Sequence, residues 1–314
     1  MNKLELGKAN LEVFSETLIE LAKNDKDIVV VTSDSRGSGK LTPFGQQFPD
    51  QIVEVGIAEQ NLVGIAAGLA ASGKKVFAVS PACFLTARSF EQIKNDVCYS
   101  DHPVNLIGIS AGVSYGALGS THHSLHDLAA LRAVNNLSII VPADNFETRE
   151  SIRLAAELPS PVYIRFGKRA IEHVHKPDDK LELGKANIIH EGGDVAFIAT
   201  GETVVQSLMA AQQLEQKGVS CRVVSMHTIK PLDIETLAQT ATKCKALITV
   251  EEHMVNGGLG EACAGYLMLT GICVPFKIVG IPDEYTVPGK QLDIFKHYGM
   301  TAEKLADAAL QLIS

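Results

Sequence analysis

The chain has 314 residues and a formal net charge of -8 at pH 7, so it lacks the basic surface that nucleic-acid binding requires. Its length predicts two domains, each large enough to bury its own core. Aromatic residues are scarce and Trp is absent, which favours helices packed on parallel strands over a β-sandwich. No apolar run reaches the roughly 18 residues of a membrane span. Six widely spaced cysteines without a Cys-x-x-Cys pair predict reduced thiols in a cytoplasmic protein and no zinc site.

The first half of the sequence alternates predicted helices and strands. Apolar residues at helical spacing predict a helix over residues 11–23, and the β-branched run at 28–31 predicts a parallel strand buried on both faces. Further strands are predicted over 76–79, 104–109, 137–141 and 162–165, and further helices over 58–72, 89–99, 124–134 and 146–157. This alternation predicts a parallel α/β sheet.

A second α/β unit follows a charged, irregular passage at residues 173–179. Its predicted strands cover 195–199, 221–224, 247–250 and 276–279, and its predicted helices cover 204–217, 234–243, 260–269 and 302–313. We therefore predict an α/β fold of two consecutive parallel-sheet domains, over residues 1–172 and 185–314.

The stretch around Glu59 differs from an ordinary helix start. An apolar approach ends at Gly56, Glu59 stands where the next helix begins, and Gly64 and Gly68 lie four residues apart within that helix. Glycines at this spacing predict a buried helix that something approaches closely. Because a buried Glu needs a partner, Glu59 either complements the positive end of the helix dipole or pairs with a ligand.

Five ordered sequence blocks carry a resemblance to a known family. They are residues 56–61 (Gly-Ile-Ala-Glu-Gln-Asn), 88–93 (Arg-Ser-Phe-Glu-Gln-Ile), 121–123 (Thr-His-His), 141–148 (Val-Pro-Ala-Asp and Glu-Thr) and 250–260 (Val-Glu-Glu-His and Gly-Gly-Leu-Gly). From about Leu11 to the C-terminus, the chain resembles the C-terminal half of transketolase-type thiamine diphosphate enzymes, and most closely the smaller subunit of transketolases split into two chains. The resemblance implies a pyrimidine-binding domain followed by a transketolase C-terminal domain.

The resemblance implies that three side chains contact the cofactor ring. Glu59 would be the carboxyl group that hydrogen-bonds the pyrimidine nitrogen of thiamine diphosphate, a role that requires it to be protonated, and burial raises a Glu pKa as this requires. Phe84 and Phe90 would form an aromatic wall against the pyrimidine, with Phe84 the better candidate. Two Phe residues beside an Ala-rich helix also suit a plain core, and only the resemblance favours the wall.

Three further residues follow predicted strand ends, where ligands of open α/β sheets bind. By resemblance, Asp34 would lie near the cofactor and Ser38 near a substrate phosphate. Lys168 falls where the family often has a phosphate-binding Arg, so it would bind a phosphate or sulfonate. An ordinary turn for Ser38 and a solvated position for Lys168 are the alternatives.

Three histidines lie at positions 122, 123 and 126. Their spacing could suggest a metal site, but Ser124 and Asp127 form a capping-box-like pair, which predicts His122 and His123 in a loop and His126 inside the next helix. The Thr-His step resembles the family's substrate-side histidine. The resemblance therefore makes His122 the residue that hydrogen-bonds the donor carbonyl and moves protons at near-neutral pH.

Two departures from the family pattern concern the substrate. Transketolases of central metabolism usually carry Glu-Asp where Ala117-Leu118 stand and His-Asp where Ser110-Ala111 stand. In the family these residues read a sugar hydroxyl and help to hold a phosphate. Their loss disfavours a substrate that presents those polar groups, so we expect a modified ketose, such as a deoxy or branched one, in place of the common pentose phosphates.

The chain also lacks the Gly-Asp-Gly motif with which the family holds Mg²⁺ and the cofactor diphosphate. An oxygen-ligand magnesium site that bridges a diphosphate cannot be built from the residues present. The resemblance therefore implies a partner, the N-terminal transketolase subunit, which would supply the diphosphate-binding half. An α2β2 heterotetramer is the simplest closed assembly.

These features predict a transferase subunit that moves a two-carbon ketol unit from a ketose to an aldose. The first alternative is another thiamine enzyme, either a 1-deoxyxylulose-5-phosphate synthase or the β subunit of a 2-oxo acid dehydrogenase. The second is a regulatory paralogue without turnover, which Glu59 argues against because a decoy needs no buried acid.

Overall fold

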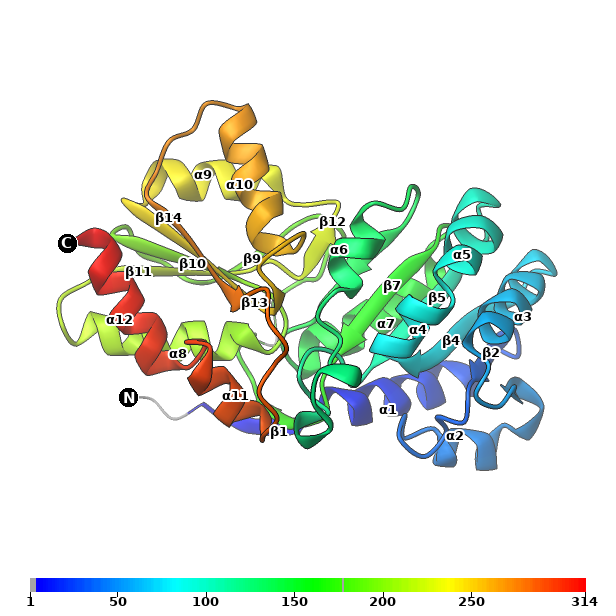
Figure 1. The fold of residues 1–314 in the computed structure, drawn as a ribbon. Helices are drawn as coiled ribbons and strands as arrows, with labels where there is room; N and C mark the ends of the chain where they lie inside the picture. Colours follow the sequence, from blue (N-terminus) through cyan, green and yellow to red (C-terminus); the bar gives the residue numbers. More distant parts are fainter. Residues whose placement is uncertain (1–3, 177) are drawn as a thin grey trace.

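The computed structural model describes residues 4–176 and 178–314. The first three residues and position 177, within the predicted boundary passage, lie outside this description. Within the described residues, strands form a seven-stranded sheet, a five-stranded sheet and a two-stranded pair. We call the two larger ones the first sheet and the second sheet. Figure 1 shows them as the centres of two α/β layers that lie side by side.

The first sheet has the order β12-β6-β7-β5-β4-β2-β3. Its strands are β2 (Ile28–Thr32), β3 (Ile52–Glu54), β4 (Lys75–Pro81), β5 (Val104–Ile109), β6 (Ser138–Ile140), β7 (Val162–Phe166) and β12 (Thr228–Lys230). Neighbouring strands pair in parallel except β12, which runs antiparallel to β6. The edge strand β12 comes from the second half of the chain, so the two halves share this sheet.

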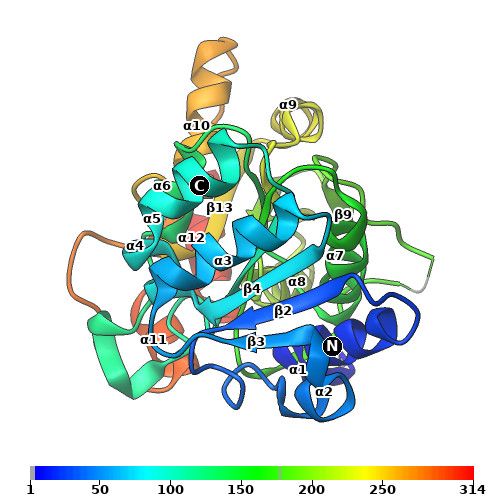
Figure 2. The same ribbon diagram turned by 90° about the vertical axis from the view of Figure 1, so that its right-hand side faces the viewer.

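Both faces of the first sheet are covered, as its β-branched strands predict. Val30 belongs to the apolar cluster that includes Phe14 of α1, whereas Val31 belongs to the cluster that includes Leu62 of α3. Figure 2 shows β3, β2 and β4 side by side, with α3 lying alongside β4. The helical segments of this half are α1 (Asn10–Ala22), α2 (Thr42–Gln47), η1 (Pro49–Gln51), α3 (Glu59–Ala71), α4 (Ala82–Arg88), α5 (Phe90–Gln92), η2 (Ile93–Tyr99), η3 (Gly116–Thr121), α6 (Asp127–Arg132) and α7 (Asn145–Glu157).

The second sheet has the order β14-β13-β10-β11-β9 and is parallel except for the antiparallel edge strand β9. Its strands are β9 (Asn187–His190), β10 (Val195–Ala199), β11 (Cys221–Ser225), β13 (Ala246–Met254) and β14 (Phe276–Ile281). Figure 1 shows α9 and α10 over one face and α8 and α12 over the other. The helices are α8 (Thr203–Glu215), α9 (Ile234–Lys243), α10 (Leu259–Leu269), α11 (Gln291–His297) and α12 (Ala302–Ile313). The predicted α/β class with largely parallel sheets is confirmed.

The two halves are also joined outside the sheets. A small antiparallel pair links β1 (Leu6–Ala9) to β8 (Ala170–Glu172). One apolar cluster extends from Leu131 and Val141 of the first half to Met226 and Leu259 of the second. The apolar core is therefore continuous between the two halves.

Some local details differ from the sequence-based expectations. The helix predicted over 89–99 is divided into α5 and the π-helical segment η2, and the preceding α4 was not predicted. Within this chain nothing closely approaches α3 at its glycines, because a Cβ built on Gly64 or Gly68 meets no atom within 4 Å. No helix in the described part of the chain has the length and apolar character needed to cross a bilayer.

Candidate active site

The candidate side chains follow the carboxyl ends of neighbouring strands in the first sheet. The loop after β2 carries Asp34 and Ser38, β4 leads directly into α4 with Phe84, and the segments after β5 and β7 carry His122 and Lys168. The ends of parallel strands meet at one edge of the sheet. The topology therefore gathers residues that are far apart in the sequence.

Glu59 lies at the first position of α3 and is 3% exposed. The chain reaches it through Gly56, whose positive φ of 71° favours glycine. Both carboxylate oxygens accept hydrogen bonds from Nη1 of Arg88 at 2.9 Å. The carboxylate lies at the wall of an open hollow lined by Ile57, Ala58, Glu59, Gln60, Asn61 and Arg88. The predicted buried acid is present, and in this chain its partner is a cation.

Phe84 and His122 form the centre of a continuous row of contacts. The Arg88 guanidinium lies 4.2 Å from the centre of the Phe84 ring, and that ring meets the His122 ring edge-on at 5.3 Å. His122 also meets the ring of Tyr115 edge-on at 5.5 Å, and Lys168 Nζ lies 4.2 Å from the centre of the Tyr115 ring. The structure therefore joins Glu59, Phe84, His122 and Lys168 in one row, with Arg88 and Tyr115 as the links.

The surroundings of Lys168, at the carboxyl edge of the first sheet, disfavour the protonated form of its amine. Partial burial, followed by repulsion from the nearby Lys40 cation, lowers the pKa of Lys168. A cation in such a place gains from a bound anion that pairs with it. The Lys40 effect also indicates that the loop after β2 lies close to the segment after β7.

Asp34 and Ser38 lie in the exposed loop after β2. Asp34 has a positive φ of 51°, and its backbone N–H donates to Glu54 Oε1 at 2.6 Å. Ser38 Oγ donates to the Ser35 carbonyl oxygen at 3.3 Å. These bonds fix the backbone of the loop and leave the Asp34 carboxylate at the surface.

Phe90 lies apart from Phe84. It is 36% exposed and lines a different hollow, together with residues that include Lys94 and Tyr99. Within this chain the two Phe side chains do not form one wall. The role predicted for Phe90 has no support from these contacts.

The three histidines of the 122–126 segment point to different surroundings. His123 is buried and hydrogen-bonded, whereas His126 is exposed and immediately precedes α6. No group of three His, Cys, Asp or Glu side chains in the described ranges is close enough to hold a metal ion. The expected Ser124 cap is wrong, because Asp127 instead accepts hydrogen bonds from Tyr163 Oη and Arg165 Nη1, both at 2.6 Å.

No role is predicted from the sequence for two residues of the site, Arg88 and Tyr115. Phe84 and Arg88 are four residues apart on α4, a spacing at which helical side chains touch, so their contact was accessible to sequence reasoning. The contact between Tyr115 and Lys168 joins two separate loops, and no local spacing indicates it.

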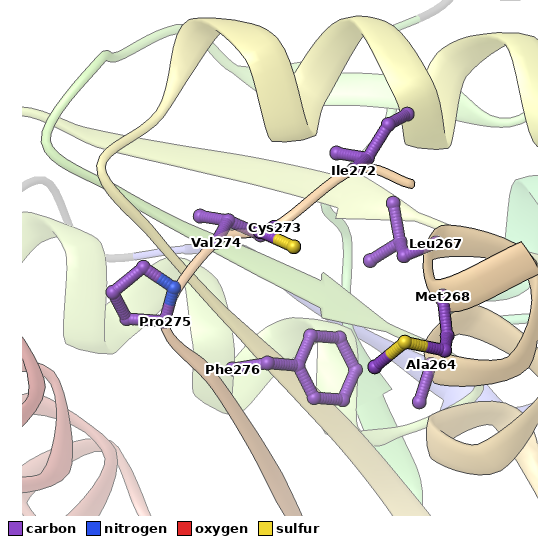
Figure 3. A pocket seen from close by; sticks show the side chains of 8 residues that line it. All are labelled: Ala264, Leu267, Met268, Ile272, Cys273, Val274, Pro275 and Phe276. Carbon is purple, nitrogen blue, oxygen red and sulfur yellow. The ribbon is translucent and has the colours of Figure 1, made fainter. Parts of the chain in front are cut away.

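A different hollow, of about 410 Å³, lies between α10 and the start of β14 (Figure 3). Its wall is apolar, with Met268 facing Phe276, and Cys273 carries the one thiol among its labelled side chains. This hollow has neither acid, base nor amide side chains to orient a polar substrate. The polar edge of the first sheet remains the better candidate for chemistry.

Comparison with known proteins agrees with this geometry. The model of the transketolase pyrimidine-binding domain matches residues 7–173, and that of the transketolase C-terminal domain matches residues 184–305. One subunit of the apulose-4-phosphate transketolase of Phocaeicola vulgatus is 48% identical over 301 residues, which cover 96% of each chain. The 1-deoxy-D-xylulose-5-phosphate synthase of Carboxydothermus hydrogenoformans is 38% identical over 94% of this chain, but the match covers 47% of that enzyme.

A solved structure described as a split gene transketolase, inactive beta4 tetramer, has a TM-score of 0.89 and 38% identity, over 98% of this chain and 99% of that one. Both domain models and both full-length similarities lead to the same assignment. The chain therefore belongs to the transketolase family, and it is a subunit of the split type that carries the pyrimidine-binding and C-terminal domains on one polypeptide.

Proposed function

We propose that this chain works with a second one to transfer a two-carbon ketol unit from a modified ketose phosphate to an aldose, with thiamine diphosphate as cofactor. The observation that carries the proposal is the buried Glu59 carboxylate at an open hollow, joined by contacts to Phe84 and His122. We assign the pyrimidine-binding role to residues 1–172 and the C-terminal role to residues 185–314.

The residues present fit the pyrimidine end of the cofactor. Glu59 would bind the ring nitrogen, while Phe84 would lie against the ring, with Asp34 near the cofactor. Arg88 donates to both oxygens of the Glu59 carboxylate in this structure, so the ring nitrogen would either share the carboxyl group with Arg88 or displace Arg88. Thiamine diphosphate, when bound, supplies the electron sink that the ketose carbon–carbon bond cleavage requires.

His122 would orient the donor carbonyl and move a proton. Its ring is half-buried between Phe84 and Tyr115, and its Nδ1 lies 3.0 Å from Thr121 Oγ1. This contact can fix the tautomer that presents Nε2 to a substrate. Lys168 would pair with the substrate phosphate, and Ser38 would lie near it.

A modified ketose suits the polar groups that this pocket lacks. Leu118 is 54% exposed where a hydroxyl-reading Asp is common in the family. The 48% identical relative is named for apulose 4-phosphate. Both features support a donor other than xylulose 5-phosphate.

The partner would hold the Mg²⁺ ion and the cofactor diphosphate. The supporting observation is that this sequence lacks the Gly-Asp-Gly motif, and the 48% identical relative is named as one subunit of its transketolase. An α2β2 heterotetramer would place the active sites between the two kinds of chain. We place the enzyme in the cytoplasm, where its six free thiols would stay reduced.

The test is to purify this chain with its candidate partner and to titrate thiamine diphosphate with Mg²⁺ into the pair and into each chain alone by calorimetry. Saturable binding by the pair alone supports the proposal, whereas equal binding by this chain alone contradicts the shared site. Mass spectrometry of products from ketose phosphates or from pyruvate, each with an aldose acceptor, separates a transketolase from a 1-deoxyxylulose-5-phosphate synthase or a 2-oxo acid dehydrogenase. A bound cofactor without any turnover would indicate the regulatory alternative.

A clear preference for xylulose 5-phosphate over apulose 4-phosphate and other modified ketoses would overturn the substrate assignment and leave the enzyme class intact.

A further inference from the structure

The segment that carries His122, residues 110–124, is held by the second half of the chain. We call it the histidine loop. At its start, the Val113 backbone N–H donates to Glu252 Oε1 at 2.8 Å, and a Cβ on Gly112 would overlap the Glu252 carboxylate. Glu252 lies near the end of β13 in the second sheet. One end of the loop is therefore fixed by the C-terminal half.

The other end of the histidine loop is fixed through His123. The His123 ring is 2% exposed, with Nδ1 2.6 Å from Thr286 Oγ1 and Nε2 3.0 Å from the Gly116 carbonyl oxygen. Thr286 comes from the segment between β14 and α11, and its hydroxyl also lies 3.0 Å from Ser120 Oγ. A Cβ at Gly116 would meet the Gly289 carbonyl oxygen, so the two segments are in close contact.

These hydrogen bonds have a consistent direction when His123 is neutral. Burial lowers the pKa of His123, which favours the neutral ring near pH 7. A carbonyl oxygen can only accept, so Nε2–H donates to Gly116 and Nδ1 accepts from the Thr286 hydroxyl. Thr286 can then accept from Ser120. The buried Nδ1 acceptor of His123 has a partner only if the Thr286 hydroxyl is present, whereas Nε2 keeps the Gly116 carbonyl oxygen in any case.

Consecutive residues in this loop face opposite sides. His123 faces Thr286 and the C-terminal half, whereas His122 faces Phe84 and Tyr115 at the candidate site. Because the two residues share a peptide unit, fixing the ring of His123 also fixes the backbone from which His122 projects. The C-terminal half can therefore control the orientation of a reacting group that it does not touch.

We propose that Thr286 is a positioning residue for the transfer reaction, because its hydroxyl fixes His123 and thereby holds His122 in its working orientation. The inference rests on the proposed function of His122. It assigns to the transketolase C-terminal domain an influence on the chemical step that is transmitted through His123.

The test compares Thr286→Val with Thr286→Ser in the reconstituted two-chain holoenzyme. Valine keeps the shape of threonine and removes the hydroxyl, whereas serine keeps the hydroxyl. We expect kcat for the ketose donor to fall roughly 10-fold to 100-fold in Thr286→Val, since misplacing a reacting group by about 1 Å costs on the order of 100-fold. Thr286→Ser should recover most of the loss, and the dissociation constant for thiamine diphosphate should be unchanged in both.

A matched control is Thr240→Val, which removes another buried hydroxyl, on α9, that has no hydrogen-bond partner among the described residues. Its kcat should equal that of the unmodified enzyme. Equal kcat in Thr286→Val and the unmodified enzyme would overturn the inference, as would an equal loss in Thr286→Val and Thr286→Ser, which would indicate packing.

Failure of the proposed function gives a different result. If Glu59→Gln retained full turnover, or if the pair did not bind thiamine diphosphate, the assignment of the site itself would fail whatever Thr286 does. An inactive Glu59→Gln together with a fully active Thr286→Val would leave the function in place and remove only the role of Thr286.

Discussion

The carboxyl edges of the two sheets use polar side chains in opposite ways. At the first sheet, His122 is half-buried, Lys168 is exposed, and a hollow opens beside Glu59. At the second sheet, strand β13 carries Glu251 and Glu252 near its carboxyl end, and they are 0% and 6% exposed. Two sheets of similar topology therefore produce an open site in one half and a filled interface in the other.

The difference between the two edges shows that sheet topology alone does not produce an open site. Whether the edge is open depends on the side chains of neighbouring segments. The glycine-rich turn before α10 could bind an anion, but Glu251 occupies it. The carboxylate oxygens of Glu251 accept from the backbone N–H groups of Leu259 at 2.7 Å and Gly260 at 2.8 Å. Glu252 meets the histidine loop of the first half. At the second edge, the protein's own side chains take the places that a ligand would take.

The strongest test of the open edge is Glu59→Gln, which keeps the size of the side chain and removes its ability to ionise. We expect kcat of the reconstituted enzyme to fall about 100-fold to 10,000-fold, the usual contribution of a proton-transferring group. The control is Glu16→Gln, because Glu16 is a half-exposed partner of Lys8 on α1. Steady-state kinetics with a ketose donor measure both variants. Intact turnover in Glu59→Gln would contradict a catalytic role for Glu59 and leave no functional difference between the edges of the two sheets.

The next largest effect is expected on stability, from a buried cluster of charged side chains around His175. The ring of His175 is fully buried, with Nδ1 3.1 Å from Asp144 Oδ2 and Nε2 3.0 Å from Glu147 Oε1. His175→Gln would leave two buried carboxylates without this cation. We expect the free energy of unfolding to fall by about 3–5 kcal/mol, as for other broken buried ion pairs. Urea denaturation at pH 7 measures it.

The same variant should change the pH dependence of stability. Burial lowers the pKa of His175, but Glu147 and Asp144 outweigh that effect and raise it to about 10, above the unfolded value near 6.5. The folded state therefore binds a proton more tightly, and His175 contributes its full stabilisation below pH 6.5, which is lost as the pH rises toward 10. The difference in unfolding free energy between the unmodified protein and His175→Gln should shrink over that range. A constant difference would contradict the ion pair.

A change at Gln291 tests whether the stability of the buried carboxylates at the edge of the second sheet depends on their hydrogen bonds. Its Nε2 donates to Glu202 Oε2 at 3.1 Å and to Glu252 Oε1 at 2.9 Å. Gln291→Met keeps the length of the side chain and removes the donor that both buried carboxylates share. We expect a loss of about 1–3 kcal/mol in unfolding free energy. Gln216→Met, at the exposed end of α8, should cost less than about 0.5 kcal/mol, and equal costs would contradict the shared hydrogen bonds.

The smallest effect is expected on KM, from Lys168 at the carboxyl edge of the first sheet. Lys168→Met should raise KM for a phosphorylated ketose roughly 2-fold to 5-fold, because a part-exposed ion pair contributes about 0.5–1 kcal/mol. Added salt should reduce the difference between variant and unmodified enzyme. Lys185→Met is the control, since Lys185 is exposed and pairs with Glu235 in the second half. An equal rise in KM for an unphosphorylated ketose would show that Lys168 does not bind the phosphate.

Sequence patterns predicted the elements that periodicity and burial determine. The helices predicted over 234–243 and 302–313 agree with α9 and α12, and the strand at 195–199 agrees with β10. The pairing of β12 with β6 could not be predicted, because a three-residue strand has too little pattern to reveal a partner about 90 residues away. The short α6 begins later than predicted because Asp127 bonds the buried Arg165 instead of capping the helix with Ser124.

The site, like the fold, has some features that could be predicted from the sequence and others that could not. The resemblance placed Glu59, Phe84 and His122 at one edge, and the structure brings them into one row of contacts. It did not indicate Arg88 as the partner of Glu59 or Tyr115 as the link to Lys168, because such contacts depend on how side chains from separate loops meet. Thr286 was also missed, since it lies 163 residues from His123.

The strand β12 has a consequence for attempts to produce the halves separately. A gene cut near residue 180 would remove Thr228–Lys230 from the first sheet and leave the backbone groups of β6 without their neighbour. Exposed strand edges recruit other chains into aggregates. The pyrimidine-binding half expressed alone should therefore precipitate or form oligomers, unless a short peptide spanning residues 226–232 is supplied to cover that edge.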